Sequence, residues 1–530
     1  MSRQFPLSFS SSFFTYLSFS PLSRLLAFLF IVAFSSGYAK AQYIVYDQQD
    51  IIEARSLDCM DEYLNVFPSI RCKKDIERTF NLQPIYMNTV HNTKYAKAIN
   101  DGPAWQGRGL NTTIGFGFSG KIGRLTYVIN PMVQYAQNKD FYTGADLTNS
   151  PEYQYPYFGN FIDYVIRYGD EPYFRLFPGQ SEISLDLKPI EVALSTQNMI
   201  WGPGIYNPII LSMNAPGIPH LKVGTSEPLE TSIGKLTANI YWGLLEESGY
   251  FNNDPDDNRR YFSAINIGYR PSFWEEMTIG IHRTFYTQTQ YAQDFFYDGF
   301  ITFSQFFSES NDRLVNGKLT NDYYDQNISI TFDWKDDNSD FNIYAEWLRA
   351  DFAGGFVALV EQYERQSAYM YGVANNFYIA TDSFIRFNYE HVSLANWHRD
   401  SFGFFWPLYS HGVNIQGHTN NGQVLGAFVG PGAQADMLNV AYVWDKNVIT
   451  FEYQRARYND DYFYTTFTNI NGPTPQDIEH QLGLRFQSEF KKLDYNIGAF
   501  IAVRDNYLFQ DETVWVNYHS NITLRYNFKN

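Results

Sequence analysis

The sequence has few basic residues and few cysteines, and it carries no long apolar run beyond its N-terminal region. Its 39 Lys and Arg are outnumbered by 56 Asp and Glu, which gives a formal net charge of −17 over 530 residues. A nucleic-acid-binding protein needs basic side chains to neutralise phosphates, so this charge balance argues against that class of partner. The mean hydropathy is −0.34. Without further apolar runs of about 20 residues, the chain is not a polytopic helical membrane protein.

The signatures of enzymes and metal sites are also missing. The nine histidines form no H-E-x-x-H, and Cys59 and Cys72 are too far apart for C-x-x-C. Residues 115–120 match G-x-G-x-x-G, but they lie within an alternating hairpin instead of between a strand and a helix. We therefore predict no enzymatic activity, no cofactor and no bound metal. For the two cysteines, a disulfide and a pair of unpaired thiols both stay open.

Aromatic residues are abundant instead. Phe (46) and Tyr (42) each outnumber Gly (36), and there are 10 Trp. Aromatic side chains favour strands and gather at membrane interfaces. A content of 45% apolar residues excludes disorder. The composition is therefore that of a folded protein rich in strands.

The N-terminal residues read as an export signal. Arg24 precedes the apolar run 25–34, which is too short to span a bilayer, and Ala39 and Ala41 fit an A-x-A cleavage site. We expect residues 1–41 to be a signal peptide that is removed, with the mature chain beginning at Gln42. Residues 42–109 are expected to form a periplasmic or plug segment. A short helix over 51–67, with Asp50 as its N-cap, is expected within it.

From residue 110 onward, apolar and polar residues alternate with a period of two. Leu110 to Phe118 and Leu125 to Ile129 form one predicted hairpin, and the pattern returns at 438–453 and 478–501. The final segment, 514–528, keeps aromatic and aliphatic residues on one face. Short turns alternate with longer polar loops, as in outer-membrane barrels.

Residues 110–530 are therefore predicted to form an all-β, transmembrane antiparallel β-barrel of about 16–18 strands whose apolar faces contact lipid. The soluble alternative is a secreted array of β-sandwiches. That alternative requires compositional breaks between domains, and no Pro/Ser linker or repeat follows residue 110. The barrel is the preferred interpretation.

Several Gly- and Pro-rich motifs do not fit membrane strands. The segment from Asn198 to Gly217 contains Trp201, Gly202, Pro203 and Gly204, and must be a structured loop or an inward fold. Trp105-Gln106-Gly107-Arg108-Gly109 precedes the alternating region, and His411-Gly412 lies in a later loop. With the strand pair around 325–327 and 344–347, these motifs are similar to the capsule-assembly Wzi family, and the aromatic-rich, Asn/Asp-rich loops suggest a Bacteroidetes-like member.

The resemblance covers nearly the whole mature chain and is most specific between Trp201 and Asn214. It implies an outer-membrane barrel of about eighteen strands that acts as a lectin and holds capsular polysaccharide or exopolysaccharide at the cell surface. Better-known members carry a larger helical region at the periplasmic mouth. Here only about 42–104 are available, so the resemblance leaves open whether the lumen is closed.

Two other functions remain alternatives. A porin-like channel would also carry inward charges on its strands, and here these are expected to include Arg167, Arg175, Arg283, Glu346, Arg386 and Glu390. An accessory barrel of a secretion or motility system is the third possibility. The expected partners are the polysaccharide, outer-membrane lipid and, during biogenesis, the barrel-assembly machinery. We expect a monomer and no nucleic acid.

Sugars have apolar C–H faces and many hydroxyl groups, so a lectin needs aromatic platforms beside polar groups. Two loop groups offer both, one from Trp397 to Trp406 and one comprising Tyr458, Asp460, Asp461, Tyr462 and Tyr464. The candidate glycan-binding or motif residues are Trp105, Arg108, Trp201, Gly202, Pro203, Gly204, Asn214, Arg283, Glu346, Glu390, Trp397, His411 and Gly412. Any single loop aromatic can instead belong to the interfacial girdle of the barrel.

Overall fold

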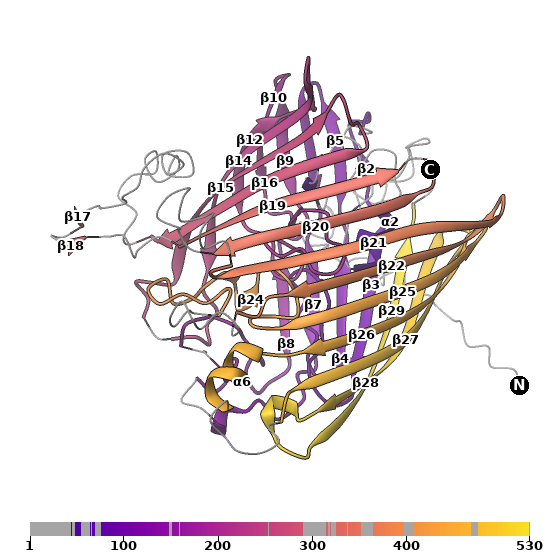
Figure 1. Cartoon of the computed structure of the whole chain (residues 1–530). Helices are drawn as coiled ribbons and strands as arrows, with labels where there is room; N and C mark the ends of the chain where they lie inside the picture. Colours follow the sequence, from indigo (N-terminus) through magenta and orange to yellow (C-terminus); the bar gives the residue numbers. More distant parts are fainter. Residues whose placement is uncertain are drawn as a thin grey trace, which may run out of the picture.

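A computed structural model of the chain describes its strands and most of their connections (Figure 1). The signal peptide, both cysteines and the whole group from Trp397 to Trp406 lie outside the described residues. The described residues are 44, 48–54, 64, 66–68, 76–147, 151–157, 160–252, 254–289, 314–315, 318–319, 325–336, 338–350, 364–396, 407–467 and 475–528.

The fold is a large antiparallel barrel with few helical residues. The first barrel strands are β2 (Asn81–Leu82), β3 (Ile85–Asn92), β4 (Gly109–Gly115), β5 (Phe118–Ile122), β6 (Leu125–Ile129), β7 (Met132–Ala136), β8 (Tyr173–Phe177), β9 (Glu182–Asp186), β10 (Ile190–Ser195), β12 (His220–Thr225) and β13 (Leu229–Thr231). The remaining ones are β14 (Gly234–Glu246), β15 (Arg259–Pro271), β16 (Met277–Gln288), β19 (Asp325–Asp336), β20 (Phe341–Ala350), β21 (Ser367–Ala380), β22 (Ser383–Ser393), β25 (Gln434–Trp444), β26 (Asn447–Arg457), β27 (Ile478–Phe490), β28 (Leu493–Asp505) and β29 (Val514–Tyr526).

The smaller elements are not part of the barrel wall. They are the helices α2 (Gln48–Ala54) and α6 (Asp460–Phe467), the 3₁₀ turns η3 (Ala145–Leu147) and η6 (Tyr507–Phe509), and the strands β1 (Val66–Pro68), β11 (Met199–Trp201), β17 (Leu314–Val315), β18 (Lys318–Leu319), β23 (Thr419–Asn420) and β24 (Gln423–Val424). β1 pairs with β11, β17 with β18, and β23 with β24. No helix among the described residues has the length and apolarity needed to cross a membrane.

The strand pairings run around the barrel in sequence order, and β29 pairs with β3 to complete the ring. Five wall strands are each recorded as two pieces: β2 continues into β3, β4 into β5, β6 into β7, β8 into β9, and β12 into β13. When each of these is counted once, the described wall has eighteen strands, which agrees with the expected 16–18. The hairpin that the sequence predicted over 110–129 is present as β4 and β5 paired with β7 and β6.

Short turns join the strands at one end of the barrel, and long connections join them at the other. The turns between β25 and β26 and between β27 and β28 have two residues each, 445–446 and 491–492. At the opposite end the connections run over 137–172, 394–433 and 458–477. In barrels of this class the short turns are periplasmic and the long loops extracellular, and the two ends are called so below.

Alternating burial sets the two faces of the wall. Along β27, Leu482 and Leu484 are exposed to the outside, whereas Glu479 and Gln481, on the opposite face of the strand, face the lumen and are buried. The same pattern recurs on β28 and β29. The outer face is therefore an apolar band suited to lipid, and polar side chains line the interior.

Two expectations about the N-terminal segment need correction. The barrel begins with β2 and β3, before the expected boundary at 109/110, because β3 pairs with both β4 and β29. The described helix α2 spans Gln48–Ala54, so Asp50 lies in its first turn and does not cap it. Phe67, the expected helix end, is part of β1. Strand pairing with β11 thus replaces the helix at that position.

Candidate functional site

The interior of the barrel is filled by chain that folds inward from the extracellular end. Residues 202–219, between β11 and β12, form the first lumen segment, and residues 407–433, between β22 and β25, form the second lumen segment. Together with inward residues of the wall they build the largest buried apolar cluster, which includes Ile209, Ile210 and Leu425. The lumen is therefore packed with side chains at this level.

Gly202 and Gly204 allow the first lumen segment to approach the wall closely. Gly202 has a φ of +87°, and a Cβ there would lie 3.1 Å from Thr331 Cγ2 and 3.3 Å from Glu346 Oε2. A Cβ on Gly204 would lie 2.8 Å from Met370 Cε. A larger residue at either position would push the segment away from the wall. Close packing against the wall therefore favours glycine at both positions, and Pro203 between them is also buried.

Trp201 is buried in the centre of this packing. None of its surface is exposed, and its ring lies 5.6 Å from the His282 ring and 5.3 Å from the Tyr241 ring. Its backbone N–H donates to Leu211 O at 3.1 Å. A fully buried indole offers no face on which a sugar can stack. In this structure Trp201 supports the first lumen segment.

Glu390, on the inner face of β22, holds the start of the first lumen segment. Its carboxylate accepts hydrogen bonds from the backbone N–H groups of Ile205 at 2.6 Å, Tyr206 at 3.1 Å and Asn207 at 2.7 Å. Tyr344 donates its hydroxyl to the same carboxylate at 3.3 Å. Because Glu390 is completely buried, these donors replace the water that it gives up.

Glu346, on β20, holds the next part of the same segment. It accepts the backbone N–H of Ile209 at 2.8 Å and of Ile210 at 3.2 Å, and Ser329 donates its hydroxyl at 2.7 Å. Both glutamates thus bind backbone donors that an irregular segment cannot pair within itself. These two inward carboxylates, which would also suit a channel lining, serve here as anchors.

The second lumen segment is joined to the first by further hydrogen bonds. Tyr409 donates its hydroxyl to Ile209 O at 2.7 Å, and His418 Nε2 donates to Ile210 O at 2.6 Å. Burial lowers the pKa of His418 to about 4, so its ring is neutral near pH 7. Asn214 donates its side chain to Val424 O at 3.0 Å. The two segments therefore form one hydrogen-bonded body within the wall.

His411 and Gly412 lie at a partly exposed turn of the second lumen segment. His411 Nδ1 accepts the backbone N–H groups of Val413 at 3.1 Å and Asn414 at 2.9 Å. The ring therefore caps a local turn. His411 and Gly412 are the sequence-predicted residues of this loop that retain some exposure.

The connection 93–108 carries Trp105 and Arg108 to another part of the lumen. Trp105 is buried, and its ring lies 5.3 Å from that of Tyr168. Arg108 Nε donates to Thr93 O at 3.0 Å. Both side chains stabilise the connection, so the contacts of this motif also serve the fold.

The other inward charges are also paired with the protein. Arg283, on β16, donates to Gln326 Oε1 at 2.7 Å and lies over the Phe285 ring. Arg175 lies over the Tyr168 ring at 4.7 Å. Arg167 was expected on a strand, but it belongs to the connection 137–172, where it binds Asp140 at 2.7 Å. The loop sequence around it alternates too weakly to be a strand.

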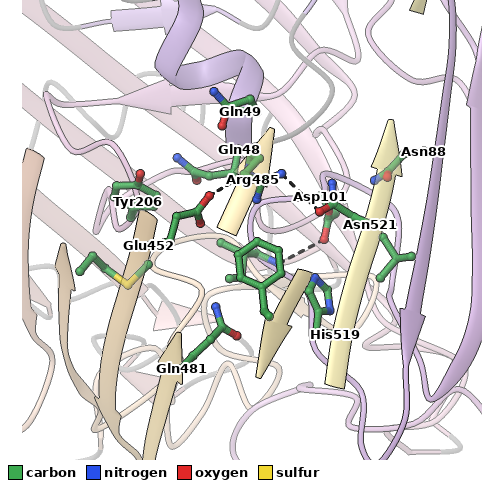
Figure 2. A pocket seen from close by; sticks show the side chains of 14 residues that line it. Gln48, Gln49, Asn88, Asp101, Tyr206, Glu452, Gln481, Arg485, His519 and Asn521 are labelled. Atoms are coloured by element: carbon green, nitrogen blue, oxygen red, sulfur yellow. Dashed lines mark hydrogen bonds and ion pairs between the residues drawn. The ribbon is translucent and has the colours of Figure 1, made fainter. Parts of the chain in front are cut away.

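Figure 2 shows a small polar cavity on the lumen side of α2, where Gln48 and Gln49 face Arg485 and Glu452. Arg485 donates to Glu452 Oε1 at 2.7 Å. The helix is fixed there because Gln48 Nε2 donates to Ile205 O at 2.8 Å. With a volume of about 50 Å³ the cavity accommodates a few water molecules but not a sugar residue.

Most polar groups of the loop predicted at 458–464 are occupied by contacts within the protein. Asp460 and Asp461 are buried at the start of α6. Arg457 binds Asp460 at 2.6 Å, and the backbone N–H of Asn396 donates to Asp461 at 2.5 Å. These carboxylates are therefore not available to a glycan, whereas Tyr462 and Tyr464 keep partial exposure.

A more accessible aromatic and acidic group was missed by the sequence analysis. It comprises Tyr153, Tyr250, Asp140, Asp170 and Arg167, and is called the rim patch below. The two tyrosine rings meet edge to face at 5.4 Å, and Tyr153 donates its hydroxyl to Asp170 at 2.8 Å. The Asp140 and Asp170 side chains are 86% and 64% exposed. Since these residues come from two separate connections, no sequence spacing could reveal the group.

A second polar group surrounds Glu247, which directly follows β14 at the extracellular end of the barrel. Gln416 Nε2 donates to its carboxylate at 2.6 Å. Burial, together with the nearby charges of Asp163 and Asp257, raises the pKa of Glu247 to about 7, although Arg260 opposes the shift. The pKa values of Asp163 and Asp257 are also raised by burial.

This shift predicts a pH dependence of the connection 247–258. Because the folded state raises the pKa of Glu247 from 4.5 to about 7, the contribution of Glu247 to stability is fully present below pH 4.5 and is lost as the pH rises through about 7. Proteolytic cleavage within 247–258 should therefore be faster at pH 8 than at pH 5. In Glu247→Gln the change between these values should be smaller. An unchanged pH profile in that variant would contradict the assignment to Glu247.

Among the described residues, no group of three or more His, Cys, Asp or Glu side chains is arranged to hold a metal ion. No curated protein matches the chain.

Among solved structures, the chain is similar to Wzi of Escherichia coli, described as a carbohydrate-binding β-barrel of the outer membrane involved in group 1 capsule assembly. The TM-score is 0.55 and the identity 10%, over 91% of this chain and 89% of that chain. It is also similar to OccAB2 of Acinetobacter baumannii (TM-score 0.40, 11% identity, 84% of this chain and 97% of that one) and to OprD of Pseudomonas aeruginosa (TM-score 0.40, 8% identity, 85% and 93%).

At 10% identity, the Escherichia coli structure shows a shared fold alone. The family itself follows from the sequence, since the model of the capsule assembly protein Wzi matches residues 85–506. This chain therefore belongs to the Wzi family of capsule assembly proteins.

Proposed function

We propose that this protein is a non-enzymatic outer-membrane barrel that binds capsular or other surface polysaccharide and helps to attach or assemble it at the cell surface. Membership of the Wzi family supports this function, as does the description of the Escherichia coli protein as carbohydrate-binding. The observation that carries the proposal is the combination of a packed lumen with a rim that has two half-buried tyrosines and two exposed carboxylates.

The packed lumen argues against the channel alternative. A porin keeps a water-filled passage between polar walls. Here both lumen segments lie across the barrel, and the inward charges Glu346, Glu390 and Arg283 bind protein groups. The N-terminal helix α2 adds a contact from the other side, since Asp50 forms an ion pair with Arg525 at 2.5 Å. We infer that α2 forms part of a small plug at the periplasmic mouth.

The rim patch offers the chemistry that sugar recognition needs. The Tyr153 and Tyr250 rings provide apolar surface for C–H faces, and the exposed carboxylates of Asp140 and Asp170 accept hydrogen bonds from hydroxyl groups. Many weak contacts along one polymer can retain it by avidity. A single such patch on a monomeric barrel is sufficient for that purpose if each polymer meets several barrels.

The proposed biogenesis follows from the same assignment. Removal of residues 1–41 by signal peptidase and insertion by the barrel-assembly machinery would deliver the chain to the outer membrane. Recovery of the protein in the soluble periplasmic fraction would contradict this placement.

The function is tested by a deletion strain together with the purified protein. Deletion should release surface polysaccharide into the medium, and the purified barrel should bind that polymer. If the polysaccharide stays attached at the parental level and the purified protein does not bind it, the anchor function is wrong. Step-like conductance of the wild-type barrel in planar bilayers would then favour a channel.

The rim patch is tested separately with a double variant, Tyr153→Ala with Tyr250→Ala. Binding of the polymer should weaken about tenfold, which corresponds to a loss of about 1.4 kcal/mol. Tyr269→Ala is the matched control, because this half-buried tyrosine lies near the periplasmic turn, where its hydroxyl donates to Ile233 O. Equal binding by both variants would show that the rim patch does not bind the polymer, and would leave the proposed function itself standing.

A further inference from the structure

The barrel wall has a gap in its extracellular half. β10 and β12 contain six residues each, whereas the neighbouring β14 has thirteen. The last paired level joins Ser195 to His220 and His220 to Gly243. Beyond it the chain turns inward as the first lumen segment. Above this level β8 pairs only with β7, and the end of β14 pairs with β15. Among the described residues, no strand pairing connects β8 to β14 there.

An outward-facing groove of about 590 Å³ lies at this gap. Its lower edge is a row of side chains from adjacent strands, in which Leu194 is opposite Ile183 and Leu221, and Leu221 is opposite Trp242. Leu244 and Tyr261, paired across β14 and β15, form one side. Pro178 and Pro219 mark the places where the strands break. The volume lies in the range of pockets that bind small organic molecules.

The groove presents apolar groups to the outside. Glu182 and His220 contribute to its lining, but both are buried and bonded on the inner side. Gln197 donates to the Glu182 carboxylate, and His220 Nδ1 donates to Ile218 O at 2.6 Å. Leu194, in contrast, is 63% exposed on the outer face. A polar ligand would find few partners in this groove.

We propose that this groove binds one acyl chain of an outer-leaflet membrane lipid. The groove is continuous with the apolar outer band, so lipid is the material that surrounds it. Moving an acyl chain from the bilayer into the groove gains no hydrophobic free energy, because lipid tails are as apolar as leucine side chains. The gain lies with the groove, because a flexible hydrocarbon can fill it and gives its lining side chains the dispersion contacts that an unfilled hollow would forfeit.

The proposal is tested with a phospholipid that carries a diazirine in its acyl chain. The full-length barrel is reconstituted in vesicles containing this lipid, irradiated, and mapped by mass spectrometry. Peptides containing Leu194, Leu221 and Trp242 should be labelled about fivefold more than those containing Ile281 and Ile330, which corresponds to about 1 kcal/mol of preference. Those isoleucines face outward on strands without a gap.

Blocking variants make the test specific. Leu194→Trp should fill the groove and lower its labelling to the level at Ile281 and Ile330. Ile190→Trp is the matched control, since Ile190 is an exposed residue on the same strand and face but outside the groove. Leu244→Trp, from the facing side, is the second block, and heat-modifiable migration verifies folding of each variant. Uniform labelling of the outer face, or equal labelling in the Leu194→Trp and Ile190→Trp variants, would overturn the proposal.

Discussion

Replacing Trp201 with alanine should destabilise the barrel by about 3–5 kcal/mol, as removal of a large buried aromatic side chain does. The ring is completely buried beside His282 and Tyr241, so its removal leaves a cavity in the packed lumen. Assembly and polysaccharide retention should therefore fail together. The measurement is the midpoint of heat-modifiable migration, combined with the amount of polysaccharide that stays on the cells.

Two further variants separate packing from recognition. In Trp201→Phe most of the ring volume is kept, and the lost indole N–H has no hydrogen-bond partner among the described residues. This variant should cost about 1 kcal/mol. Trp274→Ala removes a tryptophan that is 41% exposed and should have a small effect. Normal assembly of Trp201→Ala with loss of polysaccharide alone would instead indicate a ligand contact.

The wall of the barrel is predictable from sequence because each strand carries its own signal. Side chains on a strand alternate between lipid and lumen, so the pattern from Val514 to Tyr526 can be read without knowing any partner strand. Where the signal weakens, the prediction loses detail. The run 110–118 was read as continuous, but the strand is interrupted at 116–117, where a Cβ on Gly117 would lie 2.0 Å from Ile129 O.

The contacts inside the lumen could not be predicted in the same way. The density of Gly and Pro after Asn198 indicates a loop or an inward fold, and Glu346 and Glu390 were expected to face inward. Their partners are backbone groups more than a hundred positions away, such as the Ile205 N–H, and backbone donors leave no mark on the sequence. The rim patch has the same origin, since Tyr153 and Tyr250 belong to different connections.

The second large effect is expected for Glu390→Ala. This change leaves the backbone N–H groups of Ile205, Tyr206 and Asn207 without their shared acceptor inside the barrel. Each buried N–H group that is left without an acceptor costs about 1–3 kcal/mol. The cost falls on the first lumen segment and not on the wall, because the wall keeps its strand pairing on both sides of β22. We therefore expect an intact barrel whose first lumen segment is released.

Release of the segment has two measurable consequences. Protease should cut within 202–219 in the variant at a concentration that leaves the wild type intact, and the variant should conduct ions in planar bilayers. Glu452→Ala is the matched control, because it removes the same side chain from the same lumen but its carboxylate binds Arg485 instead of the segment. If Glu390→Ala is as protease-resistant and as non-conducting as the control, the apolar cluster alone holds the segment, and the glutamate is not its anchor. If both variants conduct equally, the conductance reports lost side-chain volume, and closure of the lumen does not depend on the segment's backbone contacts.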